Sequence, residues 1–444
     1  MKNVRLSFRA LVLATVFAAL VSPAAADGGG DLLIKNGTLL TVTGGVIPRG
    51  DILIQGGIIR RIGENIPAPP GIRIVDASGK YVMPGIIDSH THIALSGTNE
   101  GTEAIVPEVD MADVVHADDV SILTALSGGV TMVHTMHGSA NPIGGQNVTL
   151  KTKWGRPSEE LVVREATPTL KFALGENVKQ SNRQIAFNVP RRYPATRMGA
   201  NAIIRREFQK ARDYMARWER YERLKASKNP PKNLLPPRKD LALEVLAAML
   251  RGEIVARCHT YQATETLEFL ELSREFGFKI GAFEHAWEAY KIADELAEAG
   301  IGISIFADSW AYKMEAAEGI APTAAYCAQR GVLVSINSDS GERIRRLFND
   351  AGKAVKSGLS PEEALKLITI NPAIQMGVEK IAGSLEVGKH GDIAVFNEHP
   401  MSAYARCDMT VIEGEIYFDR EQYLKDREAA VEKGGAESVT GGTR

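Results

Sequence analysis

The middle of the chain alternates between short apolar runs and amphipathic helical patterns, and this alternation restricts the fold more than any other feature. Apolar runs such as GEIVARCHTY, KIGAFEH and GVLVSINSDS are separated by helical stretches such as TETLEFLELSREFG and AYKIADELAEAG. Alternation over about 290 residues indicates parallel strands connected by helices. The length favours a (β/α)8 barrel of the TIM type. A doubly wound open sheet is the alternative, but the chain lacks its glycine-rich phosphate fingerprint.

The two ends of the chain differ from the middle. Residues 27–84 and 379–425 contain short β-rich runs divided by glycine, asparagine and proline, a pattern typical of a small antiparallel sheet. We therefore predict an α/β protein with a barrel over 85–378. A small β-sandwich is built from 27–84 and 379–425, and a C-terminal tail covers 426–444.

The first 26 residues predict a secretory signal peptide. A positively charged stretch precedes the apolar run ALVLATVFAALV, and Ala24 and Ala26 occupy the positions of a cleavage site. The apolar run is too short to span a bilayer comfortably. We expect an exported protein, periplasmic or secreted, with no membrane contact after cleavage. The three cysteines are odd in number and widely spaced, so we expect buried thiols rather than a disulfide framework.

A charged helical insertion occupies about residues 200–240. It carries Tyr214, Trp218 and Tyr221 among basic residues, and a proline- and lysine-rich linker follows it. A nucleic-acid patch is one interpretation, but acidic residues interleave the basic ones, which favours a solvated helix on the barrel rim. A role as a lid stays open. The formal net charge of −2 gives no sign of a nucleic-acid partner.

Polar side chains follow the apolar runs at the ends of the predicted strands. In IIDSHTHIAL, His90 and His92 are two residues apart, so both side chains point to one side of the strand. His259, His285 and Asp339 end three further strands. The carboxyl ends of barrel strands converge on one face, so these side chains are expected to meet. Imidazole and carboxylate ligands suit Zn²⁺, with Mn²⁺, Fe²⁺ or Co²⁺ as alternatives.

The stretches VMPGIIDSHTHI, NSDS and GSLEVGKHGDIAVF resemble the amidohydrolase superfamily, and in particular its imidazolonepropionase-like, signal-peptide-bearing members. The resemblance covers nearly the whole chain after the signal peptide and implies a metal-bearing (β/α)8 barrel with a β-sandwich. It also implies that His90 and His92 bind the more buried of two divalent metals. His259 and His285 would bind the second, while Asp339 would contact a metal and carry protons.

The resemblance further implies an anion that bridges the two metals, either a carboxylated lysine or a glutamate. The stretch TLKFALGENVK offers both, as Lys171 and Glu176. The two residues are an odd number of positions apart, and successive side chains of a strand point to opposite faces, so an undistorted strand cannot point both inward. Lys171 matches the position of the carboxylated lysine in many relatives and is slightly favoured. Glu176 follows Gly175, where a turn could reorient it.

Candidate substrate contacts come from two loops. The stretch HTMHGSANPIGGQNV follows a strand and offers His134, His137 and Asn141 at the expected catalytic face. A plain strand-to-helix loop is an equally good interpretation. The stretch RRYPATRMG offers Tyr193 beside arginines, although a structural role is favoured there.

These observations predict a hydrolase that uses one or two metals to cleave a C–N bond of a small molecule. The bond would be an amide, a peptide-like bond or a cyclic amide, and not an ester. The sequence contains no G-x-S-x-G elbow, so no serine nucleophile is expected. A mononuclear deaminase or cyclic-amidine hydrolase is the alternative, followed by a non-catalytic binding protein on the same fold. A homo-oligomer is compatible with the sequence.

Overall fold

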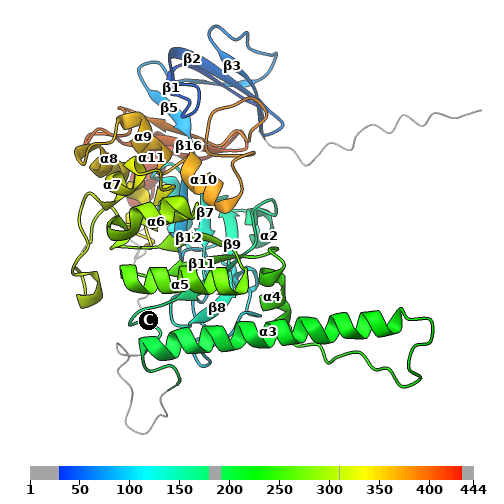
Figure 1. Ribbon diagram of the computed structural model, residues 1–444. Helices are drawn as coiled ribbons and strands as arrows, with labels where there is room; N and C mark the ends of the chain where they lie inside the picture. The colour runs from blue at the N-terminus through cyan, green and yellow to red at the C-terminus, as the bar shows by residue number, and fades with distance from the viewer. Residues whose placement is uncertain (1–29, 180–191, 310, 433–444) are drawn as a thin grey trace, which may run out of the picture.

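The strands of the protein form two separate regions (Figure 1). One is a sheet made from both chain ends, and the other is a barrel made from the middle of the chain. The computed structural model describes residues 30–179, 192–309 and 311–432. The predicted signal peptide therefore lies outside the described residues. Within the described part of the chain, no helix combines the length and apolar composition that a membrane crossing requires.

The sheet at the top of Figure 1 confirms that the two chain ends build one β-rich domain. Its order is β17-β16-β15-β5-β1-β2-β3, and β4 also pairs with β1. The strands are β1 (Leu32–Leu40), β2 (Val46–Gln55), β3 (Ile58–Gly63), β4 (Arg73–Asp76), β5 (Tyr81–Pro84), β15 (Ile393–Phe396), β16 (Cys407–Ile412) and β17 (Glu415–Asp419).

The expectation of a purely antiparallel sheet was wrong. Strand β1 pairs antiparallel with β2, but it pairs in parallel with β4 through Leu32–Lys35 and with β5 through Thr38 and Leu39. After the β1-β2-β3 meander the chain crosses back before it re-enters the sheet, so β4 and β5 run in the direction of β1.

The middle of the chain forms the barrel wall, as the alternating pattern predicts. One sheet has the order β14-β13-β12-β11-β10-β8 and the other the order β6-β7-β9. The strands are β6 (Ile86–Thr91), β7 (Val130–Thr135), β8 (Ile143–Gln146), β9 (Val148–Lys151), β10 (Thr169–Ala173), β11 (Val255–His259), β12 (Ile280–Glu284), β13 (Gly302–Ile305) and β14 (Val334–Ile336).

Side chains join the two sheets where the described backbone ladders stop. The hydroxyl of Ser89 on β6 lies 2.8 Å from the hydroxyls of Ser304 on β13 and Ser335 on β14. The backbone N–H of Asp339 donates to the carbonyl of His90 at 3.2 Å. These bonds satisfy buried polar groups across the seam and hold the ends of β14 and β6 together.

Helices cover the outside of the barrel. They are α1 (Ser121–Leu126), α2 (Ser158–Leu161), α3 (Arg197–Lys225), α4 (Leu241–Leu250), α5 (Ala263–Phe276), α6 (Ala293–Glu298), α7 (Thr323–Gln329), α8 (Leu347–Lys356), α9 (Pro361–Lys366) and α10 (Ile370–Met376). Short 3-10 turns are η1 (Met111–Val114), η2 (Ala289–Ile292), η3 (Met314–Ala316) and η4 (Arg343–Arg346).

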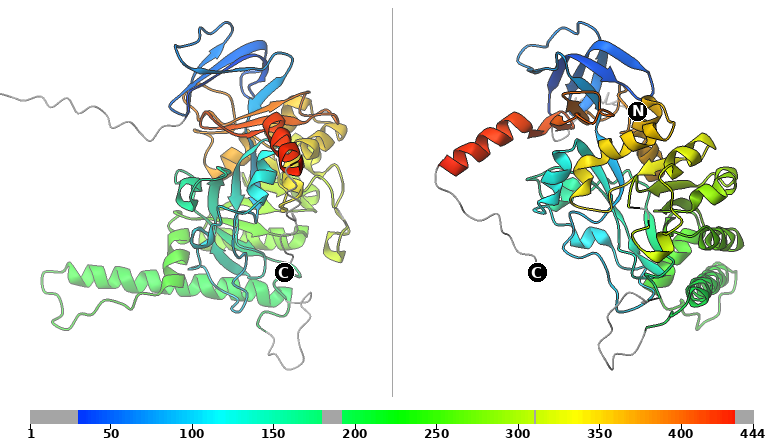
Figure 2. Two further views of the ribbon diagram at one scale, coloured as in Figure 1. Left: turned by 180° about the vertical axis from the view of Figure 1, so that it is seen from behind. Right: turned by 90° about the vertical axis from the view of Figure 1, so that its left-hand side faces the viewer.

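Helix α3 shows how the charged insertion is anchored. Its first half packs on the barrel, where the Phe208 ring stacks on Phe278 with centroids 4.6 Å apart. The buried residues of α3 end at Tyr214, and the rest of the helix projects away from the body (Figures 1 and 2). The first part of the predicted insertion therefore packs on the barrel, and the rest projects into the solvent.

Two further expectations need correction. The stretch after β7, which we expected to be a loop in contact with substrate or a plain strand-to-helix loop, contains β8, which pairs antiparallel with β10. The predicted tail from residue 426 begins inside helix α11 (Arg420–Glu432), which projects from the sandwich (Figure 2). The cysteines Cys258, Cys327 and Cys407 are buried free thiols, as expected.

A buried ion cluster fastens the sandwich to the barrel. The ammonium of Lys151, on β9, donates to Glu413 Oε1 at 2.7 Å and to Asp392 Oδ1 at 3.1 Å. It also lies 2.7 Å from Nδ1 of His390. Although burial alone would raise the pKa of Glu413, the charge and hydrogen bond of Lys151, followed by those of Lys153, lower it to about 2. Lys151 thus contacts two carboxylates of the sandwich, and Lys153 pairs with Glu413 as well, at 2.8 Å.

We predict that Lys151→Met lowers the free energy of unfolding by about 3–5 kcal/mol, because it leaves the buried carboxylate of Asp392 without its cation. Glu413 loses one of its two lysine partners and keeps Lys153. Urea unfolding at pH 7 measures the loss. The exposed Lys425, paired only with Glu421, provides the control, and Lys425→Met should change stability by less than about 0.5 kcal/mol.

The same variant gives a pH test. The folded-state pKa of Glu413 is lowered from 4.5 to about 2, so its contribution is present above pH 4.5 and is lost as the pH falls toward 2. The stability difference between the native chain and Lys151→Met should therefore narrow across this interval. A difference that stays constant from pH 7 to 3 would contradict the assignment.

Candidate metal centre

The predicted metal ligands meet at the carboxyl ends of the barrel strands. His90 lies in β6 and His92 directly after it, while His259 ends β11. His285 follows β12 and Asp339 follows β14, so four strands deliver these five side chains. Convergence of parallel strand ends, which is inherent in the barrel, brings together residues that lie far apart in the sequence.

The distances among the ligand candidates are short. The carboxylate of Asp339 lies 3.1 Å from Nε2 of His92 and 3.8 Å from Nε2 of both His90 and His285. The rings of His259 and His285 have centroids 5.0 Å apart. Donor atoms of His90, His92 and Asp339 lie within 4.8 Å of one another, close enough to share one metal ion.

The protonation of this group suits a metal. Burial lowers the pKa of His90, His259 and His285 well below the ordinary value, so these imidazoles stay neutral. Burial alone would raise the pKa of Asp339, but the hydrogen bond from His92 and the nearby imidazoles lower it. Neutral imidazoles and an ionised carboxylate are the forms that bind divalent metals.

Unpartnered nitrogen atoms support the same interpretation. Nδ1 of His259 and Nδ1 of His285 are buried without a hydrogen-bond partner in the described part of the chain. Buried polar atoms normally have a partner, and a divalent metal is a partner that an imidazole nitrogen can take. The residues present therefore fit a divalent transition metal.

Lys171 and Glu176 lie in different surroundings. The Lys171 side chain is fully buried on β10, and its Nζ lies 3.3 Å from Nε2 of His90. Burial lowers the pKa of Lys171 to about 8. Glu176 follows Gly175 in the turn after β10, and its Oε1 lies 3.3 Å from Nζ of Lys313. Lys171 therefore lies among the histidines, while Glu176 belongs to the rim.

Two fully buried residues that the sequence analysis missed hold His90 in place. Glu284 accepts from Nδ1 of His90 at 3.0 Å and from Nε of Arg257 at 2.6 Å. Arg257 also donates to the carbonyls of Ser89 and Gln375, each at 3.2 Å. A carboxylate on Nδ1 fixes the tautomer and leaves Nε2 for a metal. The available signal was a charged residue inside each of two otherwise apolar strands.

The predicted substrate contacts make several bonds within the protein. His134 lies on β7 with Nε2 2.9 Å from the Thr169 hydroxyl. His137 Nε2 accepts from the backbone of Glu100 at 3.0 Å, and its Nδ1 lies 2.9 Å from the carbonyl of Gly138. Asn141 donates to the carbonyls of Glu100 and Glu103 at 2.8 and 2.7 Å. His137 and Asn141 thus hold the loop that follows β6.

The RRYPATRMG stretch also makes structural contacts. Arg191 lies outside the described residues, and the guanidinium of Arg192 donates to the carbonyl of Gly101 at 2.7 Å. Arg197 pairs with Glu265 at 3.1 Å and with Glu315 at 3.2 Å. Tyr193 is about half exposed at 49%, close to the start of α3. Substrate contact by Tyr193, His134, His137 and Asn141 stays a prediction.

The rim next to His259 and His285 is aromatic and charged. The Tyr261 ring lies 4.6 Å from His259, and Phe306 stacks on His285 at 4.5 Å. Nζ of Lys313 lies over the Tyr261 ring at 4.8 Å and donates to Asn177 at 3.1 Å. These rings cover one side of the two histidines.

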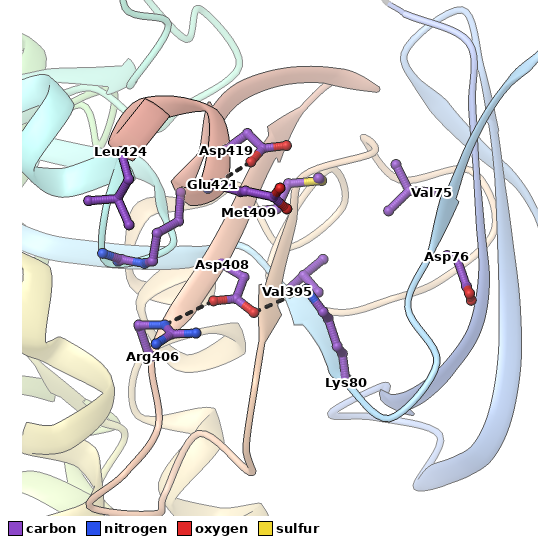
Figure 3. Close-up of a pocket in the computed structure, with 11 residues that line it drawn as sticks. Val75, Asp76, Lys80, Val395, Arg406, Asp408, Met409, Asp419, Glu421 and Leu424 are labelled. Atoms are coloured by element: carbon purple, nitrogen blue, oxygen red, sulfur yellow. Dashed lines mark hydrogen bonds and ion pairs between the residues drawn. The ribbon is translucent and has the colours of Figure 1, made fainter. Parts of the chain in front are cut away.

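A second pocket lies far from this centre, on the sandwich beside α11 (Figure 3). There Asp408 pairs with Lys80 at 3.1 Å and with Arg406 at 3.0 Å. The carboxylate already has two cationic partners, so the pocket does not resemble a second catalytic site.

Comparisons with known proteins agree with this geometry. Two models described as amidohydrolase family match residues 81–166 and 243–418. The crystal structure of an amidohydrolase from Thermotoga maritima is 33% identical with a TM-score of 0.79, and the match covers 88% of this chain and all of that one.

Curated relatives extend the comparison. Amidohydrolase tasK of Hapsidospora irregularis is 30% identical over 412 residues, which is 86% of this chain but only 41% of that protein. The chain thus spans less than half the length of this relative. The imidazolonepropionase of Symbiobacterium thermophilum is 24% identical over 416 residues, covering 82% of this chain and 90% of that protein. On the strength of the full-length match to the Thermotoga maritima structure, the chain belongs to the amidohydrolase family and is imidazolonepropionase-like.

Proposed function

We propose that the protein is a binuclear, metal-dependent hydrolase that cleaves a C–N bond in a small molecule. The substrate classes are amides, peptide-like bonds and cyclic amides. The observation that carries the proposal is the position of Lys171, whose Nζ lies 3.3 Å from His90 in the middle of the ligand candidates. A buried lysine there has no salt bridge among the described residues, whereas a carboxylated lysine would serve as an anionic ligand.

The contacts support the following assignment of ligands. His90 and His92 would hold one metal, His259 and His285 would hold a second, and Lys171 in its carboxylated form would supply the anionic ligand. The lowered pKa of Lys171 raises the fraction of neutral amine, the form that adds CO₂ with release of a proton. We take Zn²⁺ as the metal because neutral imidazole and carboxylate are its common ligands.

Bound divalent metals would supply an activated water and polarise the substrate carbonyl. Asp339 is placed to take the proton of that water and to give it to the leaving nitrogen. Its carboxylate is held by His92 at 3.1 Å and stays ionised, so it begins the cycle as a base. The Arg257–Glu284 pair keeps His90 oriented during this transfer.

The exposure of the site sets the direction of approach. The side chains of His92 and Asp339 are 26% and 27% exposed, whereas those of His90 and His285 are at most 1% exposed. Substrate therefore approaches from the side of His92 and Asp339. The imidazolonepropionase relatives support including a cyclic amide among the substrates to be screened.

A mononuclear deaminase or cyclic-amidine hydrolase is the second candidate. One observation favours it. Among the described residues, the group of at least three His, Cys, Asp or Glu side chains with donor atoms within 4.8 Å of one another consists of His90, His92 and Asp339. In that case Lys171 would act as an unmodified lysine.

Metal content distinguishes the two candidates. Elemental analysis of the native chain should give about two transition metals per chain for the binuclear centre. His90→Ala should lose metal and activity while circular dichroism shows a retained fold. One metal per native chain would favour the mononuclear enzyme, with ammonia release as the assay, and full metal content in His90→Ala would contradict both candidates.

The role of Glu284 gives a separate prediction. Glu284→Gln removes the charged acceptor of His90 Nδ1, so the affinity for Zn²⁺ should fall by about 10–100-fold. Competition with a chromogenic chelator measures this affinity without any substrate. Glu207→Gln is the matched control, since Glu207 is also a buried, ion-paired glutamate but lies on α3. Equal affinities in the two variants would rule out a positioning role for Glu284.

We also propose export of the mature chain to the periplasm or the medium through residues 1–26. Cell fractionation of the full-length chain tests this proposal. Recovery of an uncleaved chain in the cytoplasm would contradict it.

A further inference from the structure

The projecting part of the charged insertion is strongly basic. We call residues 215–239 the finger. It consists of the second half of α3 and the segment that runs back toward α4 (Figure 1). The finger carries eight lysines and arginines against two glutamates, in a chain whose formal net charge is −2.

The positive charges of the finger face solvent. All eight basic side chains are exposed, and Lys225 with Glu222 forms the one salt bridge of the finger within the described residues. That pair is exposed and 3.6 Å long, so it contributes little. Leu235 is also exposed, at 81%. A projecting segment with an excess of exposed positive charge attracts surfaces of the opposite charge.

The contacts at its base show that the finger has a defined shape. Tyr214, Trp218 and Tyr221 lie in a row along α3, with ring centroids about 6 Å apart. The buried Tyr214 anchors this row to the body, and Asp240 caps the following helix by accepting from Leu243. The helical half of the finger therefore presents its charges on a supported helix, while the other basic residues lie on the segment that returns to α4.

A second segment of the same chain has the opposite character. We call residues 97–120 the acidic belt. It carries seven aspartates and glutamates and contains neither lysine nor arginine. Glu108, Asp113 and Asp118 are exposed and make no salt bridge within the described residues. The belt is thus as strongly negative as the finger is positive.

Within one molecule, the finger and the acidic belt lie next to each other only at the base of the finger. Glu108 lines the same pocket as Arg217, Arg238 and Lys239, at the base of the finger. The rest of the finger extends away from the body in Figure 1 and in the left view of Figure 2. Apart from Lys225, the outer basic residues of the finger make no salt bridge in the described part of the chain, although the chain carries a complementary surface.

We propose that the finger docks on the acidic belt of a second copy of this chain. A two-fold arrangement satisfies both surfaces at once, because each copy donates one finger and one belt. Electrostatic attraction steers the copies together, and Leu235 adds apolar contact at the interface. This inference does not depend on the metal centre or on the proposed reaction.

Reversed charges test the pairing directly. The finger variant is Arg220→Glu, Lys228→Glu and Lys232→Glu, and the belt variant is Glu108→Lys, Asp113→Lys and Asp118→Lys. Analytical ultracentrifugation in about 0.1 M salt should show the native chain as a dimer or larger assembly. Each variant should dissociate at least about tenfold more readily, while an equimolar mixture of the two should restore assembly, because reversed finger then meets reversed belt.

The control variant carries the same change in net charge elsewhere. Arg61→Glu, Arg73→Glu and Lys380→Glu alter exposed residues outside the finger and the belt, and assembly should be unchanged. In about 1 M salt, where the Debye length is about 3 Å, the native assembly should weaken. Circular dichroism of each variant checks that its fold is retained.

Three results would overturn the proposal. One is a native chain that stays monomeric in about 0.1 M salt. Another is a mixture of finger and belt variants that fails to assemble while both remain folded. The third is a monomeric native chain that sediments with phosphatidylglycerol vesicles but not with phosphatidylcholine vesicles, which would assign the finger to an anionic lipid surface instead.

Discussion

The hydrogen-bonded chain from Arg257 through Glu284 to His90 is the constraint on which the rest of the centre depends. All three side chains are fully buried, and buried charges persist only where each has a partner. Glu284 divides its two oxygens between Arg257 and His90, at 2.6 and 3.0 Å. The orientation of His90 is therefore set by β11 and β12 through their side chains, and Nε2 of His90 faces Lys171 and Asp339 as a result.

The backbone is strained at two ligand candidates that follow barrel strands. His285 and Asp339 adopt positive φ angles of 68° and 45°, a conformation that costs side-chain-bearing residues about 1–3 kcal/mol. Both residues lie where the chain leaves a strand and turns over the mouth of the barrel. Packing and hydrogen bonding on both sides of these residues offset the cost. Nε2 of His285 and the carboxylate of Asp339, the side chains of these two residues, lie 3.8 Å apart.

The sequence predicted the barrel, the shared domain of the chain ends and the set of residues that gather at the strand ends. Those predictions rest on local signals, since a period-two strand that ends in His-x-His shows its geometry within a few residues. Arg257 and Glu284 could not be paired in this way, because the contact depends on the register between two strands. The choice between Lys171 and Glu176 had the same limit. The sequence showed that Lys171 and Glu176 would point to opposite sides of a regular strand. It did not show which of them faces the histidines, and that follows only from the contacts with His90 and Lys313.

The chain uses charge in two physically different ways. Lys151 and Arg257 are buried, and each touches carboxylates from other elements, so their interactions act at short range and are barely screened by salt. Such cations fix one arrangement of strands and domains. The basic residues of the finger are exposed, and their field extends about one Debye length into the solvent. Leaving them unpaired costs the fold little, and their attraction is available for a partner. The buried lysine and arginine that contact carboxylates thus maintain the fold, whereas the exposed basic residues of the finger are available to bind a partner.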